Sequence, residues 1–224
     1  MNLREKIIEA AFQLFGEKGY EKTTIAGIIE AAGASKGGFY HHFKSKEEIL
    51  EVITFSYVDQ VKEDYDNLLA DTSIPILDKF EDSFIRLDQL KKNNLKRWPN
   101  MQKAYTFKGN HVLLQKMVRR FEEVTTNFYH QLILQGNEAG VWDAPYPKEL
   151  AALWGREMLQ FHHWASRVFR SKDPIESEDF KRYLAFSEQL INQQLRTTGQ
   201  SVQLVTIGLN YVQSLDQFIR NEVE

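Results

Sequence analysis

The chain has 224 residues, of which 42% are apolar, a share that supports a buried core and argues against disorder. Its formal net charge of −3 gives no overall support for nucleic-acid binding, so such a function would need local positive charge. The absence of cysteine excludes disulfides and thiolate metal ligands. Residues 2–6 are mostly polar, and no apolar run approaches the roughly 18 residues of a membrane helix. We therefore expect a soluble, cytoplasmic protein without a secretory signal.

Helical periodicity begins near the N-terminus. Apolar residues at spacings of one, three and four predict a first helix, whose end is marked by Gly16 and Gly19. Thr23 or Thr24 then offers an N-cap for a second amphipathic helix. Gly33 is expected to end that helix, because glycine readily adopts the left-handed conformation found just after helices.

Two further helices follow without a long connection. Ser35 is an N-cap candidate for a short helix that runs through His42. Ser45, with Glu48 three residues later, has the spacing of a capping box and predicts a longer helix to about Leu69. The three short helices are too small to bury a core alone, so we expect them to pack on this fourth helix.

The remainder of the chain is also predicted to be helical, which makes the fold all-α. One segment is ambiguous, because "SVQLVTIGLNYV" alternates like a strand as well as showing helical spacing. A helix is favoured there because Val205, Leu209 and Val212 continue the spacing of three to four residues and no partner strand is evident. The expected helices after the fourth one are residues 76–92, 98–108, 111–139, 148–170, 177–196 and 201–221.

The local positive charge lies in the stretch "SKGGFYHHFKSKEE", which begins at Ser35. No acidic residue occurs between residues 31 and 46, whereas Lys36, Lys44 and Lys46 are all basic. Such a basic patch, confined to one end of the predicted N-terminal head, is suited to a phosphate backbone. The same patch is also compatible with a solvated surface, and the glycine pair with a plain connector.

The order helix, short turn and helix predicts a helix-turn-helix. The second helix of that motif places its N-terminal residues in a major groove, and here these residues are Ser35, Lys36, Gly37 and Gly38. The Lys36 ammonium can donate to guanine edges, and the glycines allow the backbone to approach DNA closely. Phosphate contacts are expected from Tyr40, from His41 and from Lys46 in the first turn of the next helix. Phe39 and Phe43 are expected to face the core.

The stretch "AAFQLFGEKGYEKTTIAGIIEAAGASKGGFYHHFKSKEEIL" resembles the TetR family of bacterial transcriptional regulators over about residues 7–50. Gly27 and Gly38 depart from the pattern, since other residues are more usual at those two positions. The resemblance implies DNA contacts at seven positions, with base reading mainly by Lys36 and phosphate binding mainly by Thr24, Tyr40 and Lys46. The seven are Thr24, Ser35, Lys36, Gly38, Tyr40, His41 and Lys46.

For the whole chain, the resemblance implies a DNA-binding head in residues 1–47 and a helical effector-binding and dimerisation domain in residues 48–224. It implies a homodimer built through a four-helix bundle and a palindromic operator in double-stranded DNA. The expected function is a repressor that a small apolar or aromatic effector releases from DNA. An activator, a constitutive DNA binder and a helical scaffold without DNA binding remain as alternatives.

Aromatic residues are frequent in the second domain and are candidates for an effector pocket, although each could be ordinary core. The pocket candidates are Trp98, Tyr105, Phe121, Phe128, Tyr129, Trp154, Met158, Phe161 and His162. The family topology points to the helices at 148–170 and 177–196 for the dimer. Their candidate contact residues are Trp164, Val168, Phe180, Leu184, Ile191 and Leu195. No metal-ligand spacing, cofactor motif or catalytic motif is present, so neither a metal, a cofactor nor an enzyme is predicted.

Overall fold

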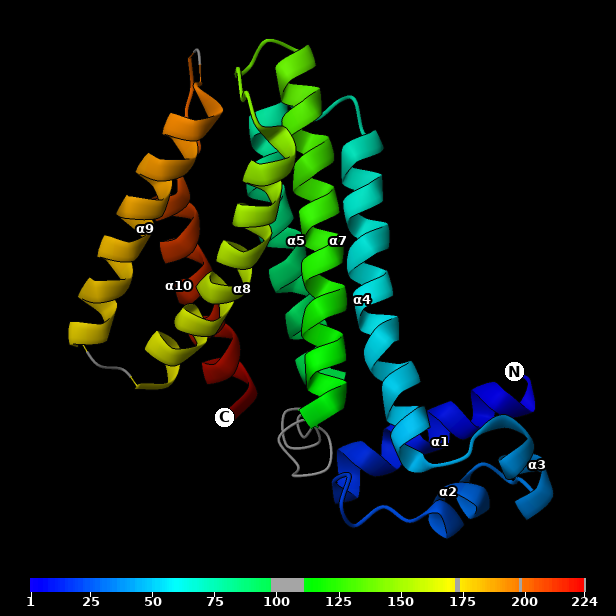
Figure 1. Cartoon of the computed structure of the whole chain (residues 1–224). Helices are drawn as coiled ribbons and strands as arrows, with labels where there is room; N and C mark the ends of the chain where they lie inside the picture. The colour runs from blue at the N-terminus through cyan, green and yellow to red at the C-terminus, as the bar shows by residue number, and fades with distance from the viewer. Residues whose placement is uncertain (98–110, 172–173, 198, 224) are drawn as a thin grey trace. The chain divides into compact units, whose positions relative to one another are not determined.

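The computed structural model describes residues 1–97, 111–171, 174–197 and 199–223, and every regular element among them is a helix (Figure 1). None of the helices in these ranges is long and apolar enough to span a membrane. The helices are α1 (Leu3–Lys18), α2 (Ile25–Ala31), α3 (Lys36–His42), α4 (Lys46–Ala70), α5 (Ile76–Arg97), α7 (His111–Glu138), α8 (Pro147–Ser171), α9 (Pro174–Leu195) and α10 (Leu204–Val223).

Side-chain caps determine where the first helices begin. The Asn2 side chain accepts a hydrogen bond from the Glu5 amide while the Glu5 carboxylate accepts one from the Asn2 amide, which forms a capping box at α1. Thr24, and not Thr23, caps α2 by accepting from the Gly27 amide at 3.1 Å. The Ser35 hydroxyl caps α3 by accepting from the Gly38 amide at 3.0 Å. Each cap satisfies an amide that the helix itself leaves without a partner.

The turn between α2 and α3 depends on Gly33. Its φ angle of 60° lies in the left-handed region that side chains with a Cβ rarely adopt. The Gly33 amide donates to Glu30 at 3.1 Å and the Ala34 amide donates to Ile29 at 2.9 Å. This pair of bonds is the Schellman motif, which satisfies the last carbonyls of α2 and reverses the chain direction. The predicted helix-turn-helix is therefore formed.

By their contacts, the residues group into two compact units. Unit 1 comprises Met1–Gln60 and Lys91–Phe121, and unit 2 comprises Val61–Leu90 and Glu122–Glu224. In unit 1, Lys116 of α7 pairs with Glu51 of α4 at 2.8 Å and Arg120 pairs with Asp59 at 2.5 Å. The head of residues 1–47 expected from the sequence lies within unit 1.

The core of unit 1 is apolar and is shared by its four N-terminal helices. Phe39 and Phe43 of α3 are 0% and 2% exposed, so both face inward as predicted. Ile28 of α2 and Ile49 and Leu50 of α4 are completely buried with them. Figure 1 shows α1, α2 and α3 gathered around the first turns of α4. Burial of large side chains from every helix holds α3 in place even though two of its seven residues are glycine.

Unit 2 is built around aromatic rings. Tyr65 of α4 stacks on Phe128 of α7 with ring centroids 4.1 Å apart, and the Ser83 and Tyr129 hydroxyls lie 3.0 Å apart. Burial raises the pKa of Tyr129 well above its ordinary value, so the phenol stays neutral. Further ring pairs connect α5, α8, α9 and α10 through Phe80, Phe84, Trp154, Phe161, Phe180 and Tyr211.

The segment that was ambiguous in the sequence is the helix α10. Its start is held by α9, because the Glu188 carboxylate accepts from the Val205 amide at 2.8 Å. Asn192 accepts from the Val202 amide at 2.8 Å and donates to the Val202 carbonyl at 2.9 Å. Gly208 permits close packing, since a Cβ there would lie 2.7 Å from a methyl group of Leu184. As a result α10 lies against α8 and α9 (Figure 1).

The remaining helices confirm the expected pattern with small shifts at their ends. α5 extends five residues beyond the predicted end at residue 92, and α9 begins at Pro174 instead of residue 177. Proline is favoured in the first turn of a helix because the missing amide needs no partner there, which explains the earlier start. The expected helix at residues 98–108 lies outside the described residues.

Candidate nucleic-acid interface

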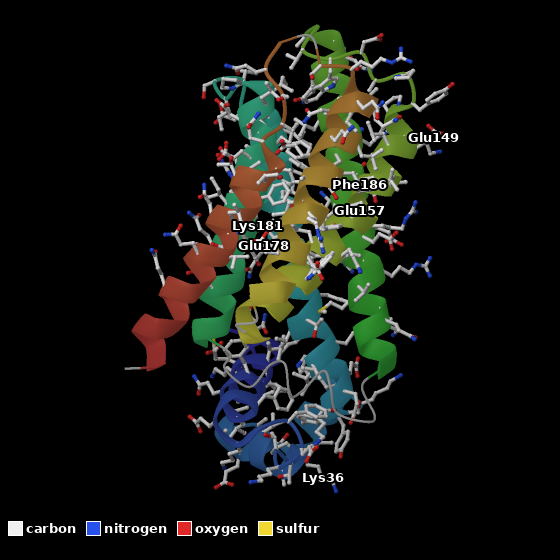
Figure 2. All side chains as sticks on the ribbon, turned by 90° about the vertical axis from the view of Figure 1, so that its left-hand side faces the viewer. Lys36, Glu149, Glu157, Glu178, Lys181 and Phe186 are labelled. Atoms are coloured by element: carbon white, nitrogen blue, oxygen red, sulfur yellow. The ribbon has the colours of Figure 1, made fainter. Side chains whose placement is uncertain are left out.

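The exposed face of α3 carries the residues predicted to meet DNA. Ser35, Lys36 and Gly37 are exposed, whereas Phe39 directly after them is fully buried. Figure 2 shows Lys36 at the free edge of the head, with its side chain directed away from the helices. The buried and exposed residues thus occupy opposite sides of one short helix, which presents an unobstructed N-terminal turn.

The two glycines of α3 have different surroundings. A Cβ at Gly37 would meet no heavy atom within 4 Å, so the space over this residue is open. A Cβ at Gly38 would lie 3.1 Å from both a Leu3 methyl carbon and the Ser35 hydroxyl oxygen. The lack of a side chain at Gly38 therefore makes room for Leu3 of α1 and for the Ser35 cap. At Gly37 no neighbour within the described part of the protein requires glycine.

Two side chains at the end of α3 and one at the start of α2 are exposed as well. Tyr40 is 48% exposed and its ring lies edge-on to that of Phe39, with centroids 5.3 Å apart. His41 is exposed and lies edge-on to His42 at 5.0 Å. Thr24 is exposed as well, although its oxygen already caps α2. Each of these groups can donate a hydrogen bond to a phosphate oxygen.

The Lys46 ammonium group, like the hydroxyl groups of Thr24 and Ser35, already has partners within the head. The Nζ atom donates to the carbonyl of Tyr20 at 2.9 Å and to that of Thr23 at 3.2 Å, with the Glu21 carbonyl at 3.5 Å. It also lies 4.3 Å from the centre of the Tyr20 ring. Lys46 is nevertheless partly exposed, and the phosphate contact expected from the sequence stays a prediction.

The contact between Tyr20 and Glu47 was not anticipated from the sequence. The Tyr20 hydroxyl donates to the Glu47 carboxylate at 2.7 Å. Partial burial would raise the pKa of Glu47, but this bond, aided by contacts with Ser45 and Lys46, holds it below its ordinary value. Sequence periodicity could not reveal this pair, because 27 positions separate the two residues.

Among the described residues, the predicted effector residues lie in different parts of the structure. Phe128 and Tyr129 are fully packed by neighbouring rings, and Phe121 belongs to unit 1 instead of unit 2. Trp98, Tyr105 and the side chain of His162 lie outside the described part of the chain. The other three candidates, Trp154, Met158 and Phe161, do come together.

These three residues border a small recess in unit 2, whose side chains leave no space that a water molecule could occupy. Four more residues complete its lining, and Glu157 is the charged one among them. The Tyr183 hydroxyl donates to the Glu157 carboxylate at 2.9 Å. Burial and this bond to a carboxylate both raise the pKa of Tyr183. The additional lining residues are Phe84, Glu157, Tyr183 and Leu204.

The predicted dimer residues of α9 face the interior of unit 2. Phe180, Leu184, Ile191 and Leu195 are at most 1% exposed, so they are covered within the single chain. Their apolar face is occupied by α8 and α10, and an apolar stripe alone cannot distinguish an internal neighbour from a second chain. Trp164 packs against the Tyr183 ring at 4.8 Å. The Val168 side chain lies outside the described residues.

The outer face of α8 and α9 instead carries exposed apolar residues. Phe186 is 64% exposed and Leu153 is 37% exposed. Figure 2 shows Phe186, Lys181 and Glu178 on the side of unit 2 that faces the viewer. Lys181 and Glu178 pair with each other at 2.6 Å, so the surface around Phe186 carries both signs of charge.

Comparison with known proteins adds independent evidence. The family described as bacterial regulatory proteins, tetR family, matches residues 7–53. The HTH-type transcriptional repressor KstR2 of Mycolicibacterium smegmatis is 33% identical over 82 residues, which are 37% of this chain and 40% of the relative. The chain thus spans about two fifths of that relative's length. The HTH-type transcriptional regulator QacR of Staphylococcus aureus is 29% identical over 152 residues, 63% of this chain and 74% of the relative.

The fold of the whole chain is also found among solved structures. A TetR-family transcriptional regulator from Syntrophomonas wolfei str. Goettingen has a TM-score of 0.56 and 18% sequence identity, covering 96% of this chain and 95% of that one. An identity this low supports the fold alone. The match of residues 7–53 includes the helix-turn-helix and the start of α4 described above. The N-terminal segment of the chain is thus similar to the tetR family of bacterial regulatory proteins, and the helical fold of the described residues resembles that of a solved regulator.

Proposed function

We propose that the chain is a DNA-binding transcriptional repressor of the cytoplasm, without enzymatic activity, that a small molecule releases from a palindromic operator. The observation that carries the proposal is the exposed N-terminal turn of α3, where Lys36 is exposed and the space over Gly37 is open, on a helix anchored by buried Phe39. A helix that packs on the core with one side and exposes the other is suited to enter a major groove.

DNA binding is tested with duplexes that tile the region beside the chain's own gene, since such regulators often lie next to what they control. Fluorescence anisotropy at several salt concentrations should give a specific site whose affinity falls steeply as salt rises. Nuclease protection should cover two half-sites related by two-fold symmetry. Equal affinity for all duplexes at every salt concentration would contradict sequence-specific regulation.

We propose a homodimer formed through the outer face of α8 and α9, with Phe186 at its centre. A two-fold axis brings the same patch of both chains together, so an exposed ring can pack on its copy. Glu178 and Lys181 then supply opposite charges that can pair across the axis. Such a dimer carries two heads and can read a palindrome.

The recess bordered by Trp154, Glu157 and Tyr183 is the proposed effector site. Its rings favour an aromatic or apolar molecule, and Glu157 is the single charged residue that lines it. A neutral or positively charged ring compound is therefore favoured over one that carries a carboxylate. Because the recess is filled by its own side chains, an effector must displace a ring in order to enter.

A thermal-shift screen tests the effector site. Ligands that bind the folded state raise the melting temperature, by an amount that grows with concentration above the dissociation constant. Aromatic amines should raise the melting temperature more than aromatic acids of the same size. The substitution Glu157→Gln should weaken stabilisation by the amines more than stabilisation by neutral compounds. Each hit is then tested for release of the protein from its DNA site.

A constitutive DNA binder is the second candidate function. The observation that favours it is the filled recess, which leaves no space for a water molecule. If the chain binds DNA constitutively, no compound in the screen should change both the melting temperature and the affinity for DNA. Specific DNA binding would remain.

A further inference from the structure

Two residues of the recess in unit 2 differ from the others in exposure. Five of its seven lining residues are at most 5% exposed, whereas Glu157 of α8 and Tyr183 of α9 are half-buried. This pair therefore marks the side of the recess that lies nearest to solvent. The five buried residues are Phe84, Trp154, Met158, Phe161 and Leu204.

The buried rings of the recess are held by contacts with other helices. The Phe161 ring contacts those of Phe84 on α5 and Tyr211 on α10, with centroids 5.3 and 5.4 Å apart. The Trp154 ring lies 5.5 Å from that of Phe80, which also belongs to α5. Displacing Phe161 or Trp154 would therefore separate rings that connect several helices of the core.

Tyr183 can leave the recess with less disturbance. Its ring lies 4.8 Å from that of Trp164, which is itself half-buried, and 6.3 Å from that of Phe180. Its hydroxyl donates to the Glu157 carboxylate at 2.9 Å, with the Glu157 carbonyl at 3.3 Å. A change of rotamer would carry this ring toward solvent and leave the buried rings in place, but it would remove the phenol donor from the carboxylate.

We infer that Tyr183 is the gate of the recess, and that the preferred effector is an aromatic compound with a hydroxyl or amino group that replaces the Tyr183 phenol on Glu157. The inference rests on the proposed effector function of this recess. A carboxylate that loses its hydrogen-bond donor in a partly shielded site costs free energy, so a ring that brings a donor is favoured over a plain hydrocarbon. A ring that carries a carboxylate would be repelled by Glu157.

The gate is tested with 4-methylphenol, which has the structure of a tyrosine side chain, by calorimetric titration of the full chain. Tyr183→Phe keeps the ring but removes its bond to Glu157, so the open state becomes more populated. The variant should therefore bind 4-methylphenol about tenfold more tightly than the original chain does. Tyr146→Phe is the matched control, since Tyr146 is 67% exposed and does not line the recess. Equal or weaker binding by Tyr183→Phe overturns the gate.

The role of Glu157 is tested with toluene, which has the same ring as 4-methylphenol without the hydroxyl. Tyr183→Phe should bind 4-methylphenol about tenfold more tightly than toluene, because only the phenol can donate to the carboxylate. Adding Glu157→Gln to this variant keeps the size of the side chain but removes its charge, and should abolish most of the preference. If Tyr183→Phe binds both compounds equally well, the effector needs no donor and this part of the inference is overturned.

Tyr183→Ala covers the case in which the original chain binds 4-methylphenol too weakly to measure. Loss of the ring leaves a space that the phenol can fill. The melting temperature of Tyr183→Ala should therefore rise with the concentration of 4-methylphenol, and it should rise less with toluene. If Tyr183→Ala is folded by circular dichroism and 4-methylphenol does not stabilise it, the phenol does not take the place of Tyr183. Should Tyr183→Ala fail to fold, the titration of Tyr183→Phe decides alone.

The gate and the proposed function fail in different experiments. Binding of 4-methylphenol is measured on the free protein, so it remains informative if no specific duplex is found. If the binding follows the expected pattern but saturating 4-methylphenol leaves the affinity for a specific duplex unchanged, the gate stands and release by this ligand class fails. Conversely, a compound that releases the protein from DNA and binds Tyr183→Phe and the original chain equally well would preserve the repressor function while removing the gate.

Discussion

At the residue scale, the seven positions of α3 divide between packing and recognition. Phe39 is completely buried and Tyr40, its neighbour, is 48% exposed. A helix places consecutive residues about 100° apart, so one short helix can hold to the core with one side and face solvent with the other. Residues of the exposed side can therefore be changed without a loss of core packing.

Lys36→Ala should reduce discrimination between the operator and a duplex altered at one base pair. A lysine that donates to guanine contributes on the order of 1–3 kcal/mol of selectivity against the wrong base. The melting temperature should stay the same because Lys36 is exposed. Competition binding with single-base variants measures the effect, and an unchanged preference would show that Lys36 reads no base.

Gly37→Ala and Gly38→Ala form a matched pair within one helix. At Gly37 the added methyl group meets nothing within 4 Å, so replacing glycine should stabilise the helix by up to about 1 kcal/mol. DNA affinity should nevertheless fall, because the methyl group occupies the space through which the backbone approaches the groove. At Gly38 the methyl group crowds Leu3 and the Ser35 cap, both at 3.1 Å.

Denaturant unfolding and anisotropy on the two variants separate the effects. Gly37→Ala should be at least as stable as the original chain yet bind DNA less tightly. Gly38→Ala should be less stable than Gly37→Ala. Full DNA affinity in Gly37→Ala would mean that this backbone does not approach DNA closely.

At the element scale, unit 2 depends on helices that approach one another through glycine. A Cβ at Gly155 of α8 would lie 2.4 Å from the Thr126 hydroxyl oxygen and 3.3 Å from the Thr126 amide nitrogen on α7. Gly136 of α7 similarly accepts the Trp142 indole, whose nitrogen donates to the Ile133 carbonyl at 2.8 Å. Gly155 therefore determines how closely α7 and α8 pack, whereas Gly136 makes room for a ring from the connection between these helices, although glycine lowers the helix propensity at both positions.

Gly155→Ala should destabilise the protein even though alanine is the better helix former. Overpacking of a close helix contact costs about 1–3 kcal/mol, which exceeds the gain of up to about 1 kcal/mol from helix propensity. Gly16→Ala in α1 is the control, because its methyl group would meet nothing within 4 Å. Thermal unfolding should give a lower melting temperature for the first variant and an equal or higher one for the second.

At the scale of the whole molecule, the choice of dimer surface depends on which apolar faces the chain covers by itself. The apolar side of α9, including Leu184, is covered by α10, and Gly208 makes that contact close. Phe186 on the other side of α9 is 64% exposed. An exposed ring of this size costs solvation free energy unless a partner covers it.

Phe186→Glu should convert the proposed dimer into a monomer. Removing an aromatic side chain from the centre of an interface typically costs about 2–4 kcal/mol, and the added carboxylates would repel each other across the two-fold axis. Sedimentation measures the dissociation constant, and circular dichroism checks that the helices persist. Tyr146→Glu is the control, since Tyr146 is 67% exposed but lies in the connection before α8. Equal dimer affinity in both variants would place the interface elsewhere.

The sequence alone determined those features that depend on neighbours along the chain. Caps at Thr24 and Ser35, the left-handed Gly33 and the spacing of apolar residues all act within a few positions, so the helices of the head could be predicted from residue order. The same local information placed Phe39 in the core and Lys36 at the surface. It also favoured a helix over a strand in the final segment.

Only the tertiary structure decided what lies opposite each side chain. It brought Lys46 to the carbonyls of residues 20–23, although a lysine in the first turn of a helix reads equally well as a phosphate ligand. It turned Leu184 toward α10 and Phe186 toward solvent, and it packed Phe128 against Tyr65. Hydrophobic burial is proportional to area and has no direction, so residue type predicts that a ring will be covered but not by which neighbour.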